Sequence, residues 1–158
     1  WKLAFPLYYV DEINQNCEMR NLDAFHILSL IREESHFDPK ARSSANAIGL
    51  MQLMLPSASF IAEKKGFEAP DDYKLQDPKY NIAVGTAYFS YVLDVVNNVP
   101  MYATGGYNGG PNAVNVWREK FKALDSDEFV ESIPYPESQY YIKKVFRSRY
   151  NYSKIYEN

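Results

Sequence analysis

The chain has 158 residues, of which 46% are hydrophobic and 23% are charged, and this size and composition are those of one globular domain. Its formal net charge of -3 supplies no overall positive field, so the composition argues against a nucleic-acid-binding protein. The single cysteine, Cys17, excludes an internal disulfide and a cysteine-based metal site.

Residues 21–35 are predicted to form a helix with one apolar side. Asn21 can cap its start, and Asp23 lies in the first turn, where a negative charge is favourable. Apolar side chains recur at steps of three and four residues, at Ala24, Ile27, Leu30 and Ile31. This helix therefore has the strongest periodic signal in the first part of the chain.

A loop and two helices are predicted next. Between Phe37 and Gly49 the helical pattern is interrupted by Asp38-Pro39 and by a run of Ser, Ala and Asn, which is typical of a loop. Pro56 suits the first turn of a helix and Gly66 its end. A longer helix is predicted from Asp77-Pro78 to Asn97-Asn98, with these residues on its inner side: Ile82, Gly85, Phe89 and Leu93.

The last third of the chain contains two pairs of glycines. Gly105-Gly106 and Gly109-Gly110 predict a tight turn that holds Tyr107 and Asn108. Three further helices are predicted, over residues 111–121, 125–132 and 136–150. No stretch alternates apolar and polar residues for long enough to indicate a strand, so we predict an all-α fold.

Glu34 is the candidate catalytic residue. It follows Ile31 by three residues and Leu30 by four, so its carboxyl group lies on the apolar side of the helix. Partial removal from water disfavours the charged form and raises the pKa, which would let Glu34 donate a proton near neutral pH. The alternative is a structural carboxylate paired with Arg32 or Lys40, and periodicity alone leaves both open. The neighbouring Glu33 is expected to be solvated.

Four ordered motifs resemble those of the soluble lytic transglycosylases. Glu34-Ser35, followed by Ser43 and by Gly49-Leu50-Met51-Gln52, is similar to the family's glutamate-serine pair and its Gly-Leu-Met-Gln turn. Residues 107–111 resemble the family's Tyr-Asn-Ala-Gly-Pro block, and residues 131–141 resemble its C-terminal segment. Four motifs in order over most of the chain are far more specific than any one of them.

The resemblance implies an all-α, lysozyme-like domain of the goose-type class with a substrate cleft. It implies that Glu34 is the catalytic acid and base, and that six further residues contact substrate: Ser43, Gln52, Met54, Tyr107, Asn108 and Glu131. Hydroxyl and amide groups can bind the N-acetyl and ring hydroxyl groups of a sugar, and Met54 can supply an adaptable apolar contact. Tyr107 would steady the reacting ring or the glutamate, and Glu131 would hold Tyr107.

The implied activity is that of a carbon-oxygen lyase acting on the glycan strands of peptidoglycan. It would cleave the β-1,4 bond between N-acetylmuramic acid and N-acetylglucosamine without water and leave a 1,6-anhydro end. Most glycosidases need two carboxylates, whereas this sequence points to one, so the muramoyl C6 hydroxyl would replace the second. No cofactor and no metal would be required. The alternatives are a lysozyme-like muramidase, which adds water to each cut, and a catalytically idle wall-binding domain.

Three positions depart from the family pattern. Asn46 stands where glycine is usual, and because Asn tolerates positive φ, we expect the loop to keep its geometry. Leu55 is an extra residue between Met54 and Pro56, which leaves the placement of Met54 open. Gly109 replaces an alanine, which is a mild change in a turn.

The resemblance also suggests how the chain is divided. Residues 1–6 are similar to the segment that precedes the catalytic domain in larger family members, which carry a helical region upstream. We therefore predict a lead-in with a first helix over residues 1–20 and a catalytic domain over residues 21–158. Neither a leader-like segment nor an apolar run of about 18 residues is visible, so we expect no signal peptide and no membrane span in this sequence. The implied substrate places the protein in the bacterial periplasm.

Overall fold

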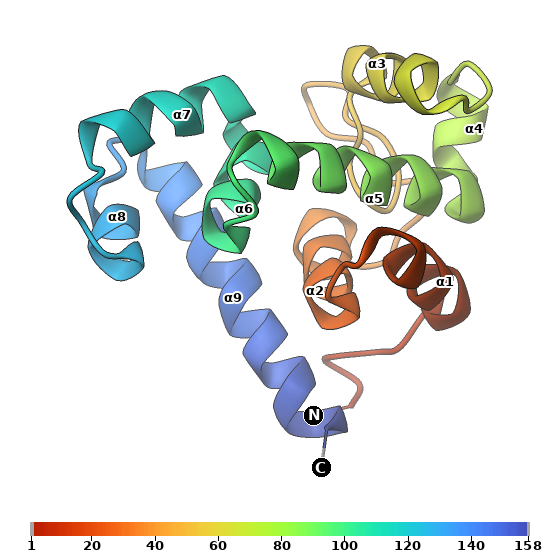
Figure 1. The fold of residues 1–158 in the computed structure, drawn as a ribbon. Helices are drawn as coiled ribbons and strands as arrows, with labels where there is room; N and C mark the ends of the chain where they lie inside the picture. Colours follow the sequence, from red (N-terminus) through yellow and green to blue (C-terminus); the bar gives the residue numbers. More distant parts are fainter. Residues whose placement is uncertain (1, 158) are drawn as a thin grey trace. The chain divides into compact units, whose positions relative to one another are not determined.

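A computed structural model describes residues 2–157, and these residues form an all-α fold, as predicted (Figure 1). Within them the only β pairing consists of two isolated bridges, Arg42 with Ile48 and Ile48 with Leu53. The helices are α1 (Val10–Arg20), α2 (Ala24–Ser35), α3 (Leu55–Lys65), α4 (Asp72–Gln76), α5 (Pro78–Val95), α6 (Pro100–Gly109), α7 (Pro111–Lys120), α8 (Ser126–Ser132) and α9 (Pro136–Tyr156). None of these helices has the length and apolar character that a membrane crossing requires.

The chain divides into two compact units. The first contains the described residues up to Tyr88 and those from Ser148 onward, and the second contains Phe89–Arg147. Helices α5 and α9 therefore each contribute residues to both units.

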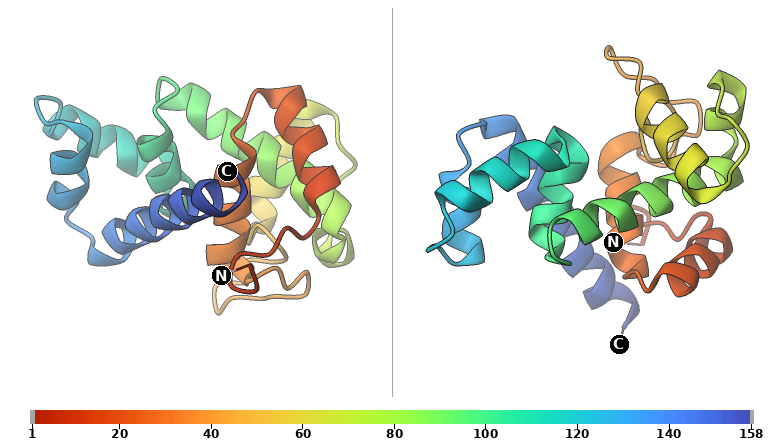
Figure 2. Two further views of the ribbon diagram at one scale, coloured as in Figure 1. Left: turned by 90° about the horizontal axis from the view of Figure 1, so that it is seen from below. Right: turned by 45° about the horizontal axis from the view of Figure 1, so that its top comes forward.

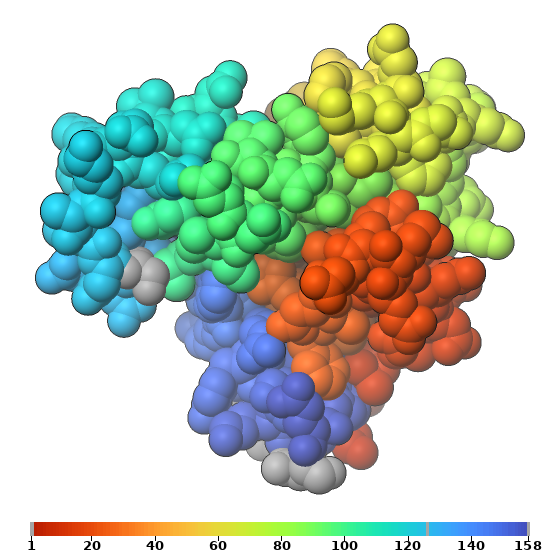
Figure 3. Space-filling view, viewed as in Figure 1, coloured from red at the N-terminus to blue at the C-terminus, as the bar shows by residue number. Residues whose placement is uncertain are grey.

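Helix α2 forms the centre of the first unit. Ile27, Leu30 and Ile31 are fully buried, as the apolar period predicted. Helix α1 packs against α2, and on the face in Figure 3 only a small area of α2 is visible beside α1. A buried α2 places its C-terminal end, and with it Glu34, on a rigid element.

The predicted start of α2 is wrong by about three residues. Asp23, and not Asn21, is the N-cap, and its side chain accepts hydrogen bonds from the backbone N–H groups of Phe25 and His26. Asn21 instead ends α1 in the left-handed conformation, with φ 54°. Both residue types suit helix termini, so the sequence did not distinguish the cap of one helix from the end of the other.

Helix α9 extends six residues beyond its predicted end near Tyr150. Its last turns pack on the N-terminal segment, where the Tyr152 hydroxyl donates to the carbonyl of Pro6 at 3.0 Å and the Tyr156 hydroxyl donates to the carbonyl of Phe5 at 2.8 Å. The two views in Figure 2 also show the chain ahead of α1 beside the last turns of α9. These long-range contacts stabilise a helical end that local propensity does not indicate.

In the second unit, the predicted tight turn around Tyr107 and Asn108 is wrong, because both residues lie in α6. Gly105 and Gly106 are buried, and a Cβ atom there would lie 3.1 Å from Ile142 and 2.9 Å from Val92, respectively. These glycines thus allow close helix packing instead of a turn.

The remaining predicted helices are confirmed with small shifts of their ends. Pro56 lies in the first turn of α3, and Gly66 ends that helix in the left-handed conformation, with φ 76°. Helix α5 buries Ile82, Gly85 and Phe89, while Leu93 is half-buried. Helices α7 and α8 match the predicted ranges to within one residue.

His26, in the first turn of α2, should make folding sensitive to acid. It is only 4% exposed, and burial lowers its pKa from 6.5 to about 4, with Arg149 adding to the effect and Asp23 opposing it. Between these two pKa values the unfolded chain binds a proton that the folded chain does not, so stability falls as pH decreases through this window. We expect this group to remove about 2 kcal/mol of the free energy of unfolding between about pH 7 and about pH 5.

Urea denaturation of variants at several pH values measures this effect. His26→Gln should flatten the pH dependence in that window. His36→Asn is the matched control, because His36 is exposed and asparagine tolerates its positive φ of 51°. Equal pH dependence in the wild type and His26→Gln would contradict this assignment.

Candidate functional site

Glu34 lies in the last turn of α2, one residue before the helix ends at Ser35. Glu34 is half-buried, which confirms the prediction that this residue is partly removed from water. The chain then turns sharply, because His36 adopts the left-handed conformation and donates its backbone N–H to the carbonyl of Arg32. The candidate acid is therefore held at a fixed helix terminus beside a loop.

The neighbouring Glu33 is not solvated, contrary to the prediction. Its side chain is 3% exposed, and its Oε1 accepts hydrogen bonds from Arg32 and, at 2.6 Å, from the Ser148 hydroxyl. Arg32 also donates to the carbonyl of Ala4 at 2.9 Å and lies over the ring of Phe5. Arg32 is thus a partner of Glu33.

Ser35 connects the end of α2 to the Gly49–Gln52 turn. The Ser35 hydroxyl is buried and lies 2.8 Å from the carbonyl of Leu50, to which it can donate. Gly49 has φ 81°, which favours glycine. This contact brings Glu34 and Gln52, which are 18 positions apart in the sequence, to adjoining segments of one structure.

Asn81 of α5 holds the same turn and was missed by the sequence analysis. This side chain is fully buried; its Oδ1 accepts from the backbone N–H of Met51 at 2.8 Å, and its Nδ2 donates to the carbonyls of Ile48 at 3.0 Å and Leu75 at 2.7 Å. Asn81 lies four residues before Gly85, on the same side of the helix. A polar residue on this apolar side was therefore the sequence feature that could have indicated a buried structural role for Asn81.

Asn81→Ala is expected to lower the free energy of unfolding by about 3 kcal/mol, because it removes one buried hydrogen bond from each of three backbone groups, of which the Ile48 carbonyl keeps the N–H of Leu53. Thr86→Val is the matched control. Thr86 is also fully buried on α5, but its hydroxyl bonds only to carbonyls of its own helix, so its loss should cost about 1 kcal/mol. Urea denaturation measures both, and equal losses would contradict the role given to Asn81.

Gln52 is the best-anchored polar side chain of the loop. Its Nε2 donates to the carbonyls of Ala41 at 3.1 Å and Gly49 at 2.9 Å, which leaves Oε1 as an acceptor for a bound molecule. The residue is half-buried and has φ 48°. The amide donors of Gln52 are thus bonded to the backbone of the loop itself, and its amide oxygen can accept a hydrogen bond from a bound molecule.

Ser43, Asn46 and Met54 complete the loop in the first unit. The Ser43 hydroxyl accepts from the backbone N–H groups of Ala45 and Ala47, so its proton remains available for donation. Asn46 has φ 65°, which confirms that an asparagine adopts the positive φ expected there. Met54 is 39% exposed and immediately precedes α3.

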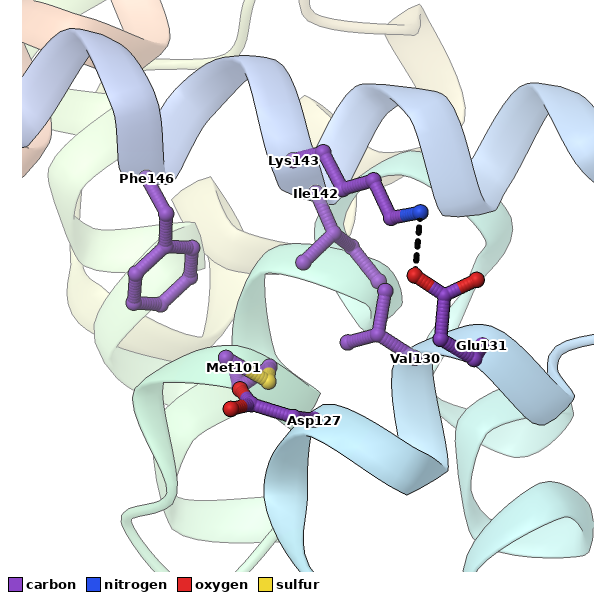
Figure 4. Close-up of a pocket in the computed structure, with 7 residues that line it drawn as sticks. All are labelled: Met101, Asp127, Val130, Glu131, Ile142, Lys143 and Phe146. Atoms are coloured by element: carbon purple, nitrogen blue, oxygen red, sulfur yellow. Dashed lines mark ion pairs between the residues drawn. The ribbon is translucent and has the colours of Figure 1, made fainter.

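Tyr107, Asn108 and Glu131 belong to the second unit. The half-buried Tyr107 ring packs edge-on against Phe89, and Asn108 is exposed and accepts a long hydrogen bond from the Ser138 hydroxyl. Glu131 forms an ion pair with Lys143 (Figure 4) and accepts a long hydrogen bond from Gln139. The turn into α9 thus brings Gln139 and Lys143 to Glu131, and the expected contact between Glu131 and Tyr107 stays a prediction.

Within residues 2–157, no three His, Cys, Asp or Glu side chains are grouped as metal ligands. Cys17 is buried in α1, and burial raises the pKa of its thiol to about 12. A thiol with this pKa stays protonated and is a poor nucleophile.

Comparison with known proteins identifies similar sequences and structures. The family model of the transglycosylase SLT domain matches residues 11–130. The soluble lytic murein transglycosylase of Salmonella typhimurium is 34% identical over 145 residues, which cover 89% of this chain and 22% of the relative. The membrane-bound lytic murein transglycosylase C of Edwardsiella ictaluri is 30% identical, over 93% of this chain and 47% of that protein.

Solved structures show the same fold. The crystal structure of the 70 kDa soluble lytic transglycosylase of Escherichia coli matches with a TM-score of 0.94 and 30% identity, over 98% of this chain and 25% of that one. An inactive glutamate-to-glutamine mutant of the lytic transglycosylase Slt of Pseudomonas aeruginosa matches with a TM-score of 0.93, 30% identity and the same coverage. The chain thus spans about a quarter of the length of these proteins.

Proposed function

This chain belongs to the transglycosylase SLT domain family, and on that premise we propose that it cleaves peptidoglycan as a lytic transglycosylase with Glu34 as its acid and base. The observation that carries the proposal is the position of Glu34, which is half-buried in the last turn of α2. Partial burial and the negative end of the helix dipole both disfavour a charged carboxylate, which suits a group that has to donate a proton.

In the proposed reaction, Glu34 donates its proton to the oxygen that links N-acetylmuramic acid to N-acetylglucosamine. The glycosidic bond breaks as an oxocarbenium-like state forms at C1 of the muramoyl ring. The carboxylate of Glu34 then removes the proton from the C6 hydroxyl of the same ring, and that oxygen bonds to C1. One proton leaves Glu34 and one returns, so the 1,6-anhydro product forms without water.

The loop residues of the first unit would bind the sugar beside Glu34. The free acceptor Oε1 of Gln52 suits an N–H or hydroxyl donor, and the Ser43 hydroxyl suits an acceptor such as an acetamido oxygen. The exposed Met54 would supply an apolar contact to the ring. Ser35 and Asn81 would act as positioning residues, because they hold the turn that carries Gln52.

Tyr107, Asn108 and Glu131 are proposed as substrate contacts of the second unit. An aromatic ring with a hydroxyl suits a sugar, since it offers an apolar face and a hydrogen-bonding edge. Asn108 is exposed and has amide groups that match ring hydroxyls. We also propose a periplasmic location and an upstream helical region in the complete protein. The names of the murein transglycosylases that this chain resembles support a location at the bacterial envelope, and the small share of those proteins that this chain covers supports a further region in the complete protein.

Purified sacculi test the proposed function. Incubation with the chain should lower their turbidity and release soluble muropeptides, which liquid chromatography detects. An idle wall-binding domain would sediment with the sacculi and release nothing, and that result would overturn the proposal.

A further inference from the structure

The turn after Glu34 contains two consecutive residues in the left-handed conformation. His36 has φ 51° and Phe37 has φ 63°. Histidine adopts this conformation more readily than most residues, whereas a bulky side chain such as that of phenylalanine rarely does. A strained backbone of this kind persists only where the surrounding contacts stabilise it, and such strain concentrates at functional sites. Contacts beyond the turn itself must therefore hold Phe37 in place.

Phe37 is held by burial and by an aromatic neighbour from the segment ahead of α1. It is 7% exposed, and its ring packs edge-on against Tyr8, with ring centroids 5.6 Å apart and an interplanar angle of 86°. Burial of a phenylalanine side chain contributes about as much free energy as one left-handed residue costs. The two rings also line a cavity of about 320 Å³, so the turn is not closely packed on every side. The Tyr8 ring is thus a support of the Phe37 ring and of the backbone conformation at Phe37.

The same turn fixes the end of the helix that carries Glu34. The N–H of Asp38 donates to the carbonyl of Ser35 at 3.0 Å, and this bond closes the turn around its two left-handed residues. Ser35 is the last residue of α2 and directly follows Glu34. Without the Phe37 ring the turn could relax toward a commoner backbone conformation. The last turn of α2 would then lose its fixed end, and the carboxyl group of Glu34 would lose its fixed position.

We propose that Phe37 is a positioning residue, which fixes the carboxyl group of Glu34 through the backbone of this turn and is itself supported by Tyr8. This inference rests on the proposed function, because it gives the position of Glu34 a catalytic purpose. A displacement of a reacting group by about 1 Å can reduce a rate about 10²-fold. Core packing alone would explain the burial of Phe37. It would not explain a left-handed backbone three residues after the acid, since an extended or helical residue can be buried equally well.

Kinetics of folded Phe37→Ala test this proposal, with a soluble glycan fragment of peptidoglycan as the substrate. The kcat should fall about 10²-fold, whereas KM should change by less than about threefold. Phe37→Leu keeps a large apolar side chain and should recover most of the kcat. A purely structural role would lower stability and leave the kcat of the folded protein unchanged. A kcat of Phe37→Ala within about threefold of the wild type would therefore overturn the proposal.

Tyr8→Ala tests the same contact without removing a buried side chain, since Tyr8 is 59% exposed. It should lower kcat about tenfold, and its combination with Phe37→Ala should lower kcat little further than Phe37→Ala alone, because both changes remove one contact. Tyr8→Phe keeps the ring and should match the wild type. An unchanged kcat in Tyr8→Ala, or effects of the two changes that simply multiply, would overturn the role given to this contact.

Ile13→Ala is the matched control, because Ile13 is fully buried on α1 and lies outside the proposed site. This variant should lose stability, as core truncations do, but its kcat should stay within about threefold of the wild type. A loss of kcat in Ile13→Ala equal to that in Phe37→Ala would show that any damage to the core has this effect, and the proposal would be wrong.

The wild type decides the proposed function separately. If it released no muropeptides from sacculi, the catalytic function itself would be wrong. Release by the wild type together with an unimpaired Phe37→Ala would overturn only the positioning role.

Discussion

Glu34→Gln is expected to reduce muropeptide release from purified sacculi by at least about 10³-fold. Glutamine keeps the size and polarity of the side chain but cannot give or take a proton at neutral pH. Because the proposed mechanism uses Glu34 for both proton transfers and uses no second carboxylate, no other group can replace it. Initial rates of release, measured with equal amounts of folded protein, give the ratio.

Glu33→Gln makes the same chemical change one residue earlier on α2 and is the control. Glu33 accepts hydrogen bonds from Arg32 and Ser148, so this variant should lose stability. Its rate at a temperature where it remains folded should stay within a few-fold of the wild type, since Glu33 contributes no proton to the proposed reaction. If Glu33→Gln were inactive and Glu34→Gln active, the assignment of the acid would be wrong.

Gly49→Ala is expected to destabilise the fold by about 4 kcal/mol or more. Gly49 has φ 81°, and a Cβ atom there would lie 2.2 Å from the carbonyl oxygen of Leu75 and 2.4 Å from Nδ2 of Asn81. Neither neighbour can move freely, because Asn81 is buried and bonded to three backbone groups. Thermal unfolding should show a midpoint lower by about 10 °C or more.

Gly66→Ala separates the backbone strain from the clash. Gly66 has nearly the same φ, 76°, but a Cβ atom there would meet nothing within 4 Å. This variant should therefore cost only about 1 kcal/mol, which is the cost of a left-handed conformation for alanine. Similar losses in Gly49→Ala and Gly66→Ala would show that close packing at Gly49 is not the cause.

The helix ends that depend on single residues could be predicted from the sequence. Pro56 and Gly66 bracket α3, and Pro111 opens α7, because proline and glycine act through their own backbone geometry. The apolar period of α2 likewise predicted its buried side and the half-buried position of Glu34. The position of the candidate acid could thus be predicted from periodicity, whereas its catalytic role is what the family resemblance implies.

Contacts between distant residues account for what the sequence analysis missed. Glu33 is buried because Ser148, 115 positions later, and Arg32 satisfy its carboxylate. The last turns of α9 form against residues 5 and 6 at the other end of the chain. A glycine can form a turn, or it can allow two helices to pack closely. Gly105 and Gly106 allow close packing, and only the positions of the neighbouring side chains show this.

The most direct test is digestion of sacculi in water enriched in heavy oxygen, followed by mass spectrometry of the released muropeptides. Since the muramoyl C6 oxygen is expected to close onto C1, every new end should be a 1,6-anhydro end that carries no solvent oxygen. New reducing ends that contain the heavy oxygen would show that water attacks C1, and the chain would then be a hydrolase instead of a lytic transglycosylase.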